Sequence, residues 1–304
     1  MYFVRRLIFA IPLLLVISAL AFVLVHVAPG GPFDRERAPA SPEIERHLQA
    51  KYHLNEPVWK QYLRYLGGLA HGDFGPSLKY RDHTVNDIIA QGLPVSMTLG
   101  SLAFCFSLGI GLPLGFFTAA RRGRWEDYTG SFLATLAVCV PGFVLAPFLV
   151  VVFAIKLKWL PVALWESPAE VILPMIALGA YSAGKVARLF REGMLSAMQS
   201  EFITAARAKG MGENALLLKH AVRTVVLLVV SYSGPMLADL LTGSFVIENI
   251  FQIPGVGVFF INSSLNADYM MTVDLALLYA VLLIALNLVV DFAYTLLDPR
   301  VKYE

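Results

Sequence analysis

Residues 191–224 read REGMLSAMQSEFITAARAKGMGENALLLKHAVRT and form a polar, basic insert between two strongly apolar segments. Within it Met198, Phe202 and Ala206 recur every fourth residue, which predicts a helix with a narrow apolar stripe. The pattern stops at Gly210, a residue type that readily takes the left-handed conformation of a helix C-cap. A second short helix is predicted to follow it. The insert therefore reads as a helical elbow, and the small residues at its bend would let another protein approach closely.

The composition of the chain is that of a membrane protein. Hydrophobic residues make up 57% of its 304 residues and charged residues 15%, with a mean hydropathy of +0.66. A soluble domain has a very different balance. The formal net charge of +2 is small, and no nucleic-acid partner is expected. We expect one transmembrane domain that covers residues 1–304.

Six segments are long and apolar enough to cross a bilayer, for which a helix needs about 20 residues. They are 7–27, 94–120, 128–155, 170–190, 225–248 and 274–296. The first follows Arg5 and Arg6, as a signal peptide would, but its apolar run is longer than the usual signal sequence. We therefore expect an uncleaved span. The long segment 28–92 mixes proline, glycine and charge, and is predicted to lie outside the membrane.

Positive charge predicts the orientation of these spans, because cytoplasmic loops are rich in lysine and arginine. With a cytoplasmic N-terminus, the inner segments hold Arg5, Arg6, Arg121, Arg122, Arg124, Arg188, Arg191, Arg207, Lys209, Lys219, Arg223, Arg300 and Lys302. The short outer loops hold only Lys156 and Lys158. Both termini are therefore predicted to be cytoplasmic, and 28–92 to be periplasmic.

One run in the insert resembles the cytoplasmic coupling loop of bacterial ABC-importer membrane subunits: Thr204-Ala-Ala-Arg-Ala-Lys-Gly210. That family has Glu-Ala-Ala, three residues and a glycine, and Thr204 takes the place of the glutamate, as in the peptide branch. Four motifs resemble the dipeptide/oligopeptide permease group: HGDFGPS at 71–77, GSFVIE at 243–248, IPGVG at 253–257 and DPR at 298–300. Residues 28–87 look most like the B subunit of oligopeptide permeases. The resemblance covers essentially the whole chain.

The resemblance implies an all-α integral membrane protein whose coupling elbow contacts ATPase subunits. The coupling residues that it implies are Phe202, Thr204, Ala205, Ala206, Arg207, Lys209 and Gly210. The implied partners are a second homologous permease, two ABC ATPases and an external peptide-binding protein. ATP and Mg²⁺ would be bound by the ATPases. One departure is that Thr224 and Leu228 stand where the family usually has prolines, which predicts a straighter helix into the fifth span.

Asp239 is predicted to lie about mid-way along the fifth span. An ionised side chain at the bilayer centre costs at least ~2.5–3.5 kcal/mol, so it should face protein or water rather than lipid. Two interpretations remain open. Asp239 could line the translocation pathway and attract cationic groups of peptides, or it could form a buried hydrogen-bonded pair with a neighbouring helix.

Other acidic residues in or near the spans have simpler interpretations. Asp291, Asn287 and Tyr294 form a stripe at helical spacing on the sixth span, which is typical of polar contacts between membrane helices. Glu248 and Asp274 are predicted to lie near the outer interface, where a charge is less costly.

No motif predicts a reaction or a cofactor in this chain. Gly179–Val186, GAYSAGKV, nearly matches a phosphate-binding loop, but valine replaces the required serine or threonine and the segment lies in an apolar span. Cys105 and Cys139 are predicted to be packing residues rather than a disulfide or a metal pair. The chain is therefore expected not to be an enzyme and to bind no metal or cofactor.

The sequence predicts a permease subunit that imports oligopeptides across the bacterial inner membrane, with ATP hydrolysed by its partners. Dipeptide, nickel-chelate and glutathione importers remain alternatives within the family. A proton-coupled secondary transporter would instead use Asp239 or Asp291 as its proton carrier, and ATP dependence of uptake separates it from an importer. A membrane-embedded enzyme or scaffold is the third class.

Overall fold

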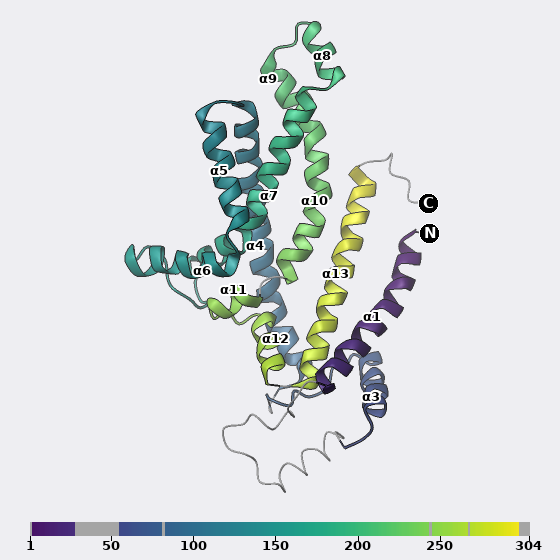
Figure 1. The fold of residues 1–304 in the computed structure, drawn as a ribbon. Coiled ribbons are helices and arrows are strands. Elements are labelled where there is room, and N and C mark those ends of the chain that lie inside the picture. Colours follow the sequence, from purple (N-terminus) through teal and green to yellow (C-terminus); the bar gives the residue numbers. More distant parts are fainter. Residues whose placement is uncertain (1, 28–54, 81–82, 243–244, 267, 298–304) are drawn as a thin grey trace. The chain divides into compact units, whose positions relative to one another are not determined.

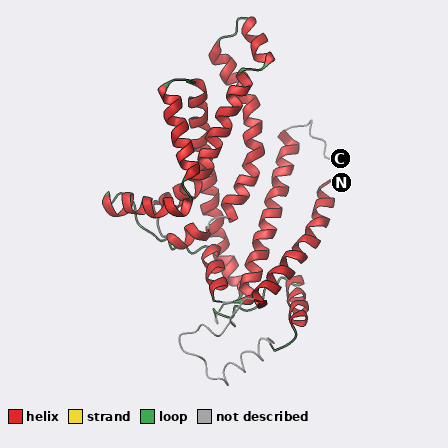
Figure 2. Cartoon of the chain, in the orientation of Figure 1, coloured by secondary structure: helices red, strands yellow, loops and turns green. Residues whose placement is uncertain are grey.

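The computed structural model describes residues 2–27, 55–80, 83–242, 245–266 and 268–297. Every regular element in these ranges is a helix, and one isolated bridge joins Pro76 to Thr84 (Figure 2). The elements are α1 (Tyr2–Val27), α3 (Val58–Ala70), α4 (Val85–Ala120), α5 (Trp125–Cys139), α6 (Gly142–Leu149), η1 (Val150–Lys156), η2 (Pro168–Val171), α7 (Ile172–Met198), α8 (Glu201–Ala208), α9 (Glu213–Ala215), η3 (Leu216–Ala221), α10 (Val222–Thr242), α11 (Phe245–Ile250), α12 (Val256–Leu265) and α13 (Tyr269–Leu297).

The predicted all-α membrane fold is confirmed. In the described ranges, five helices are long and apolar enough to cross a membrane, or six if one bent pair counts as a single span. All six predicted spans have a counterpart among these candidates. The candidates are Arg6–Val27, Val85–Ala120, the bent pair Trp125–Cys139 with Gly142–Lys156, Pro168–Met198, Glu213–Ile250 and Tyr269–Val289.

The third span is not the single helix that the sequence predicted. It breaks at Pro141, and the two halves meet at 106°. Val140 and Pro141 have extended backbones, with ψ of 114° and 142°. Proline has no N–H for an intrahelical hydrogen bond and restricts the residue before it, so a helix commonly ends there. After Pro147 the second half continues as a π-helix from Val150 to Lys156.

Two spans begin earlier than predicted because polar side chains cap them. The Thr84 N–H and hydroxyl both donate to Asp87, at 3.0 and 2.6 Å, and the Asp87 N–H donates back to the Thr84 hydroxyl at 3.2 Å. This reciprocal cap starts α4 at Val85 instead of residue 94. Asp268 likewise precedes α13 and accepts a hydrogen bond from the Met271 N–H.

The described residues form two compact units. The first contains residues up to 96 together with 254–284, and the second contains 97–253 together with 285–303. In the first unit, Val85 and Ile88 of α4, Val256 of α12, and Met271 and Leu275 of α13 form a buried cluster.

The described part of the predicted 28–92 segment contains α3, a loop and the start of α4, whereas residues 28–54 and 81–82 lie outside the described ranges. The loop carries the HGDFGPS motif. The buried Ser77 hydroxyl donates to the buried Asp268 carboxylate, and the Lys79 N–H donates to the same carboxylate at 3.2 Å. Asn86 accepts from the Phe74 N–H at 3.0 Å. These bonds tie the loop to the first turns of α4 and α13.

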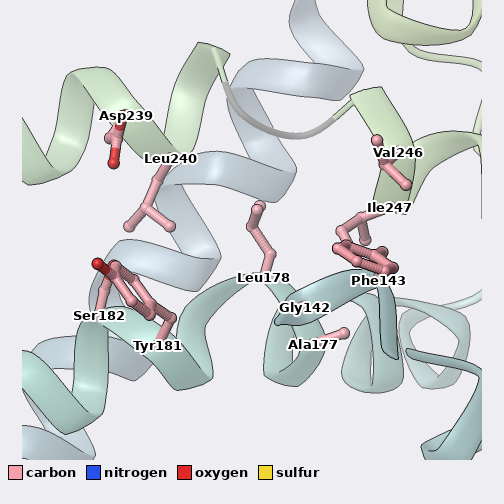
Figure 3. A pocket seen from close by; sticks show the side chains of 10 residues that line it. All are labelled: Gly142, Phe143, Ala177, Leu178, Tyr181, Ser182, Asp239, Leu240, Val246 and Ile247. Atoms are coloured by element: carbon pink, nitrogen blue, oxygen red, sulfur yellow. The ribbon is translucent and has the colours of Figure 1, made fainter. Parts of the chain in front are cut away.

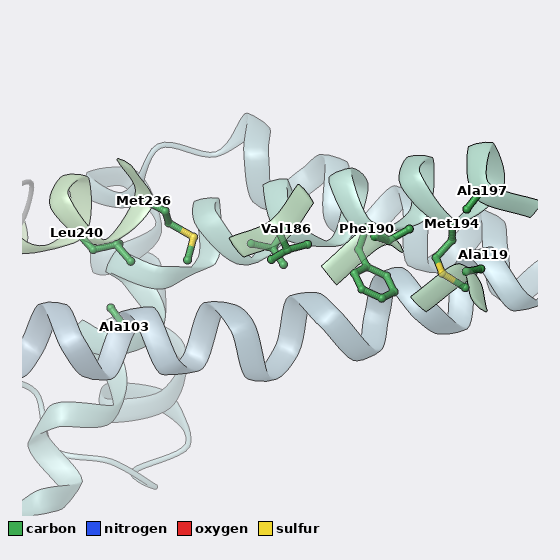
Figure 4. Close-up of a cluster of buried hydrophobic side chains, with 11 residues drawn as sticks. Ala103, Ala119, Val186, Phe190, Met194, Ala197, Met236 and Leu240 are labelled. Atoms are coloured by element: carbon green, nitrogen blue, oxygen red, sulfur yellow. The ribbon is translucent and has the colours of Figure 1, made fainter. Parts of the chain in front are cut away.

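The second unit is built around α7. Its core joins side chains of α4, α7, η3 and α10 (Figure 4), namely Ala103, Ala119, Val186, Phe190, Met194, Ala197, Ala221, Val225, Val229, Met236 and Leu240. Glycines bring the helices unusually close. A Cβ at Gly115 of α4 would lie 2.5 Å from the Ala187 carbonyl oxygen, and one at Gly184 of α7 would lie 2.6 Å from that of Ala134 in α5. Helices α4, α5 and α7 therefore pack with their backbones nearly in contact.

Candidate functional site

The predicted elbow is present at one end of α7 and α10, where α8 and α9 project (Figure 1). Helix α8 ends in a left-handed glycine, as the sequence predicted, because Gly210 has φ of +85°. The Gly210 N–H donates to the Arg207 carbonyl at 2.9 Å, and the Met211 N–H donates to that of Ala206 at 3.3 Å. These two bonds form a Schellman motif, which satisfies the last carbonyls of the helix. The bend is thus determined locally.

An ion pair crosses the bend. Arg207 Nε lies 2.6 Å from Glu213 Oε1, and its Nη2 lies 3.2 Å from Oε2. The hydrogen bonds to Glu213 raise the pKa of the Arg207 guanidinium. A bidentate arginine–carboxylate contact specifies geometry, and here it joins the end of α8 to the start of α9. Sequence reasoning did not pair these residues, since no regular helical spacing connects them across a glycine.

The elbow has a buried side and an exposed side. Ile203 of α8 and Leu216 of η3 are wholly buried and anchor it to the body of the unit. The predicted apolar stripe is wrong, because Met198 is the last residue of α7 and Phe202 is 47% exposed on a separate helix. Of the predicted coupling residues, Ala206 is half-buried and the others are exposed: Phe202, Thr204, Ala205, Arg207, Lys209 and Gly210.

The helix that enters the elbow is tied to its neighbour by a second ion pair. Arg191 of α7 donates to Asp127 of α5 through Nε at 2.7 Å and Nη2 at 3.0 Å. The Asp127 side chain is 5% exposed and that of Arg191 27%. Asp127 also accepts from the Gly123 N–H at 3.0 Å and from the Ser131 hydroxyl at 3.3 Å. The ion pair therefore links the end of α7 that enters the elbow to α5.

After the bend, the chain is helical without a break from Glu213 to Thr242, through α9, η3 and α10. The straighter approach inferred from the absence of prolines stays a prediction, and this stretch contains the π-helix Leu216–Ala221.

A pocket of about 280 Å³ lies at the other end of α7 and α10 from the elbow. Figure 3 shows Asp239 and Leu240 of α10 across from Tyr181 and Ser182 of α7. Helices α6 and α11 close the pocket with apolar side chains. The full lining is Gly142, Phe143, Ala177, Leu178, Tyr181, Ser182, Asp239, Leu240, Val246 and Ile247. The pocket is thus mostly apolar, with a carboxylate and two hydroxyl groups.

Asp239 lies within the candidate span Glu213–Ile250. Helix α10 ends at Thr242 and α11 begins at Phe245, so Asp239 is in the last turn of α10. Its side chain is exposed in the chain and lines the pocket. It also interacts electrostatically with Lys185 and Tyr232. Sequence reasoning missed Tyr181, Ser182 and Lys185 as its neighbours, although a lysine inside an apolar span is itself a signal.

Several other predicted residues lie elsewhere. Glu248 and Asp274 are wholly buried in the protein, and their place near the outer membrane interface stays a prediction. Asn287 and Asp291 of the predicted polar stripe are partly buried, and the side chain of its third member, Tyr294, lies outside the described set. Cys105 and Cys139 are free thiols exposed on the chain, so they do not pack inside it as predicted.

The segment Gly179–Val186 lies within α7 and is helical. A phosphate-binding loop needs free backbone N–H groups, which a helix interior does not present.

Comparison with known proteins explains this combination of an exposed elbow and a membrane-spanning bundle. Residues 111–303 match the family described as "Binding-protein-dependent transport system inner membrane component", and residues 1–100 match the N-terminal region described for the same components. The chain belongs to this family. It is therefore a multi-pass membrane subunit of a binding-protein-dependent transport system.

Relatives of this membrane component extend over almost its full length. It is 43% identical to the Oligopeptide transport system permease protein OppB of Haemophilus influenzae, over 98% of each chain. It is 40% identical to the Dipeptide transport system permease protein DppB of Bacillus subtilis, over 99% of this chain and 97% of the relative. An inward-facing structure of the MetNI methionine ABC transporter shares the fold, with a TM-score of 0.57, 18% identity, and 69% of this chain and 96% of that chain covered.

Proposed function

We propose that this membrane component is one of two pore-forming subunits of an ATP-driven importer of oligopeptides. The observation that carries the proposal is the elbow, an exposed bend between α7 and α10, which both contribute to the lining of the pocket. Relatives named as oligopeptide permeases support the substrate class. In this scheme the chain catalyses no reaction, and the movement of its helices opens the transport pathway.

The proposed partners follow from the same scheme. Two ABC ATPases dock on the elbow residues 202–210 and hydrolyse ATP with Mg²⁺, a second homologous permease completes the pore, and an external binding protein delivers the peptide. Closure of the ATPases moves the elbow, and α7 and α10 shift with it. The pathway then opens to alternate sides, and Asp239 lies on it.

The orientation with both termini in the cytoplasm belongs to this proposal. The Arg121–Arg124 turn and the Arg191 end of α7 lie at the same end of the second unit, since Asp127 bonds to both Gly123 and Arg191. That end carries the elbow and most of the cations of this unit, which favours the cytoplasm.

The test of function is uptake by the complete transporter reconstituted in vesicles with its binding protein. We expect peptide uptake that requires ATP hydrolysis inside the vesicles and the binding protein outside. Uptake driven by a proton gradient without ATP would instead support a secondary transporter. Competition between di-, tri- and tetrapeptides, nickel chelates and glutathione separates the importer alternatives. The dipeptide alternative has its own support in the Bacillus subtilis relative.

The orientation is tested by cysteine labelling in a variant without Cys105 and Cys139, because both native thiols are exposed. Lys79→Cys should react with a membrane-impermeant maleimide from the periplasmic side and Ser196→Cys only from the cytoplasmic side. Both positions are exposed, whereas the neighbouring Ser77 is buried and would not label. Labelling of both positions from one side would contradict the topology.

A further inference from the structure

Helix α7 carries a polar stripe that its role as a packing helix does not require. Tyr181, Lys185, Arg188 and Glu192 are all exposed and follow one another at spacings of four, three and four residues, so they share one face of the helix. The opposite face is buried and packs against α4 and α10. Lys185 is the central residue of the 27-residue helix.

Lys185 lies within a small group of polar side chains from two helices. Its Nζ lies 4.6 Å from the centre of the Tyr181 ring, a cation–π contact along α7. It also interacts electrostatically with Asp239 and Tyr232 of α10. The titratable groups of this neighbourhood are therefore one lysine, one aspartate and two tyrosines. The pocket beside them is lined by Tyr181, Ser182 and Asp239.

A lysine within a membrane span should face protein or water, because lipid does not solvate its charge. The stripe points away from the packed face of α7, so the body of its own unit does not cover it. A water-filled passage would solvate it. A peptide with free ends is a zwitterion, and it presents one ammonium and one carboxylate to whatever lines such a passage.

The geometry points to a binding site for the two charged ends of a peptide, with Lys185 binding the terminal carboxylate and Asp239 binding the terminal ammonium. This assignment rests on the proposed function as a peptide importer. The two residues interact electrostatically when no peptide is present. An incoming zwitterion replaces that interaction with two others, one between Lys185 and the peptide carboxylate and one between Asp239 and the peptide ammonium. Neither charged side chain is then left without a counter-ion in the membrane.

The size and chemistry of the pocket fit this ligand. Its volume of about 280 Å³ is just below the usual range of pockets that enclose small-molecule ligands, so it suits a short peptide whose two ends lie close together. Its apolar lining tolerates different side chains, while the charges recognise the groups that every free peptide has. The Tyr181 ring restricts where the Lys185 ammonium can lie.

The test uses the complete transporter in proteoliposomes with saturating binding protein. Three probes are compared: trialanine, its C-terminal amide and its N-acetyl form. We expect Lys185→Gln to lower uptake of trialanine by about tenfold, the size expected for one lost charge-assisted hydrogen bond, and to leave uptake of the amide unchanged. Asp239→Asn should likewise lower uptake of trialanine by about tenfold, and it should leave uptake of the N-acetyl form unchanged. Because one binding protein serves all variants, its own preferences cancel in each ratio.

Lys185→Arg keeps the charge and should retain the preference for the free carboxylate. Lys156→Gln is the matched control, since Lys156 is an exposed lysine of η1 outside the pocket, and it should behave like the wild type. If Lys185→Gln lowers uptake of all three probes equally, or of none of them, the proposed site for the peptide ends is wrong. If Lys185→Gln lowers uptake of all three probes equally and less of the second permease is recovered with the purified complex, the stripe is a contact between subunits instead. A wild-type transporter without ATP-dependent uptake of any probe overturns the proposed function before the variants are compared.

Discussion

The elbow and the pocket lie at opposite ends of the same two helices and are stabilised in opposite ways. In the elbow, the decisive contacts join residues close in sequence, such as Gly210 to Arg207 and Arg207 to Glu213. In the pocket, Tyr181 and Asp239 come from different helices and meet only because α7 packs against α10. The elbow exposes most of its predicted coupling residues, whereas the pocket is closed largely by apolar side chains.

This difference separates the two functions that the chain must combine. A change in the elbow should affect docking and the transmission of motion while leaving the pathway intact. A change in the pocket should affect which peptide passes while leaving ATPase docking intact. The ion pair of Asp127 with Arg191 lies between them and should affect stability.

The largest effect is expected from Gly210→Val. The φ of +85° at Gly210 is a conformation that costs an L-residue about 1–2 kcal/mol, and more for a β-branched one. The elbow should change shape, and stimulation of the ATPase by loaded binding protein should fall to the basal rate. Gly212→Val is the matched control, because Gly212 has an ordinary φ of −68° and nothing within 4 Å of an added Cβ. Equal activity of both variants would remove the bend from the mechanism.

Asp127→Asn should come next, through stability. Removing one partner of a mostly buried ion pair leaves Arg191 without its counter-charge, at a cost of about 2 kcal/mol once the partial exposure of Arg191 is taken into account. The melting temperature of the purified protein should drop clearly. Glu126→Gln is the adjacent control, since its pair with Arg121 is more exposed and is worth less than about 1 kcal/mol. A similar melting temperature for both variants would show that burial of the pair contributes nothing.

Asp239→Asn should change preference more than stability. The substitution preserves shape and removes the charge on the pocket wall, so peptide transport should slow, by several-fold more for basic peptides than for acidic ones. Uptake of both peptide classes and the melting temperature are measured together. Asp291→Asn, the predicted helix–helix contact, should instead lower the melting temperature without a change of preference. A destabilised Asp239→Asn complex with unaltered preference would contradict the pathway role.

The smallest effect is expected from Arg207→Gln. Its pair with Glu213 is exposed, with 44% and 59% of the two side chains accessible, and such pairs contribute little to stability. The melting temperature should stay within error of the wild type, while ATPase stimulation falls modestly because the bend is less well defined. The double change Arg207→Glu with Glu213→Arg should restore stimulation. If the reversed pair is as weak as the single variant, the arginine acts through direct contact with the ATPase.

The sequence by itself determined the membrane class, the approximate place of six spans and the elbow with its glycine. These follow from composition, from hydropathy and from the backbone freedom of one residue, all of which act over short distances along the chain. The resemblance to importer permeases rested on local motifs and was confirmed by the family match.

Only the tertiary structure decided the 106° break at Pro141, the burial of Glu248 and Asp274, and the group formed by Tyr181, Lys185 and Asp239. A proline marks a possible break, but packing of both halves decides its angle. Likewise, hydropathy indicates that a residue lies in a span, but it does not indicate which face of that helix packs against other helices. That choice depends on contacts between residues far apart in the chain, such as the close approach of Gly115 to Ala187.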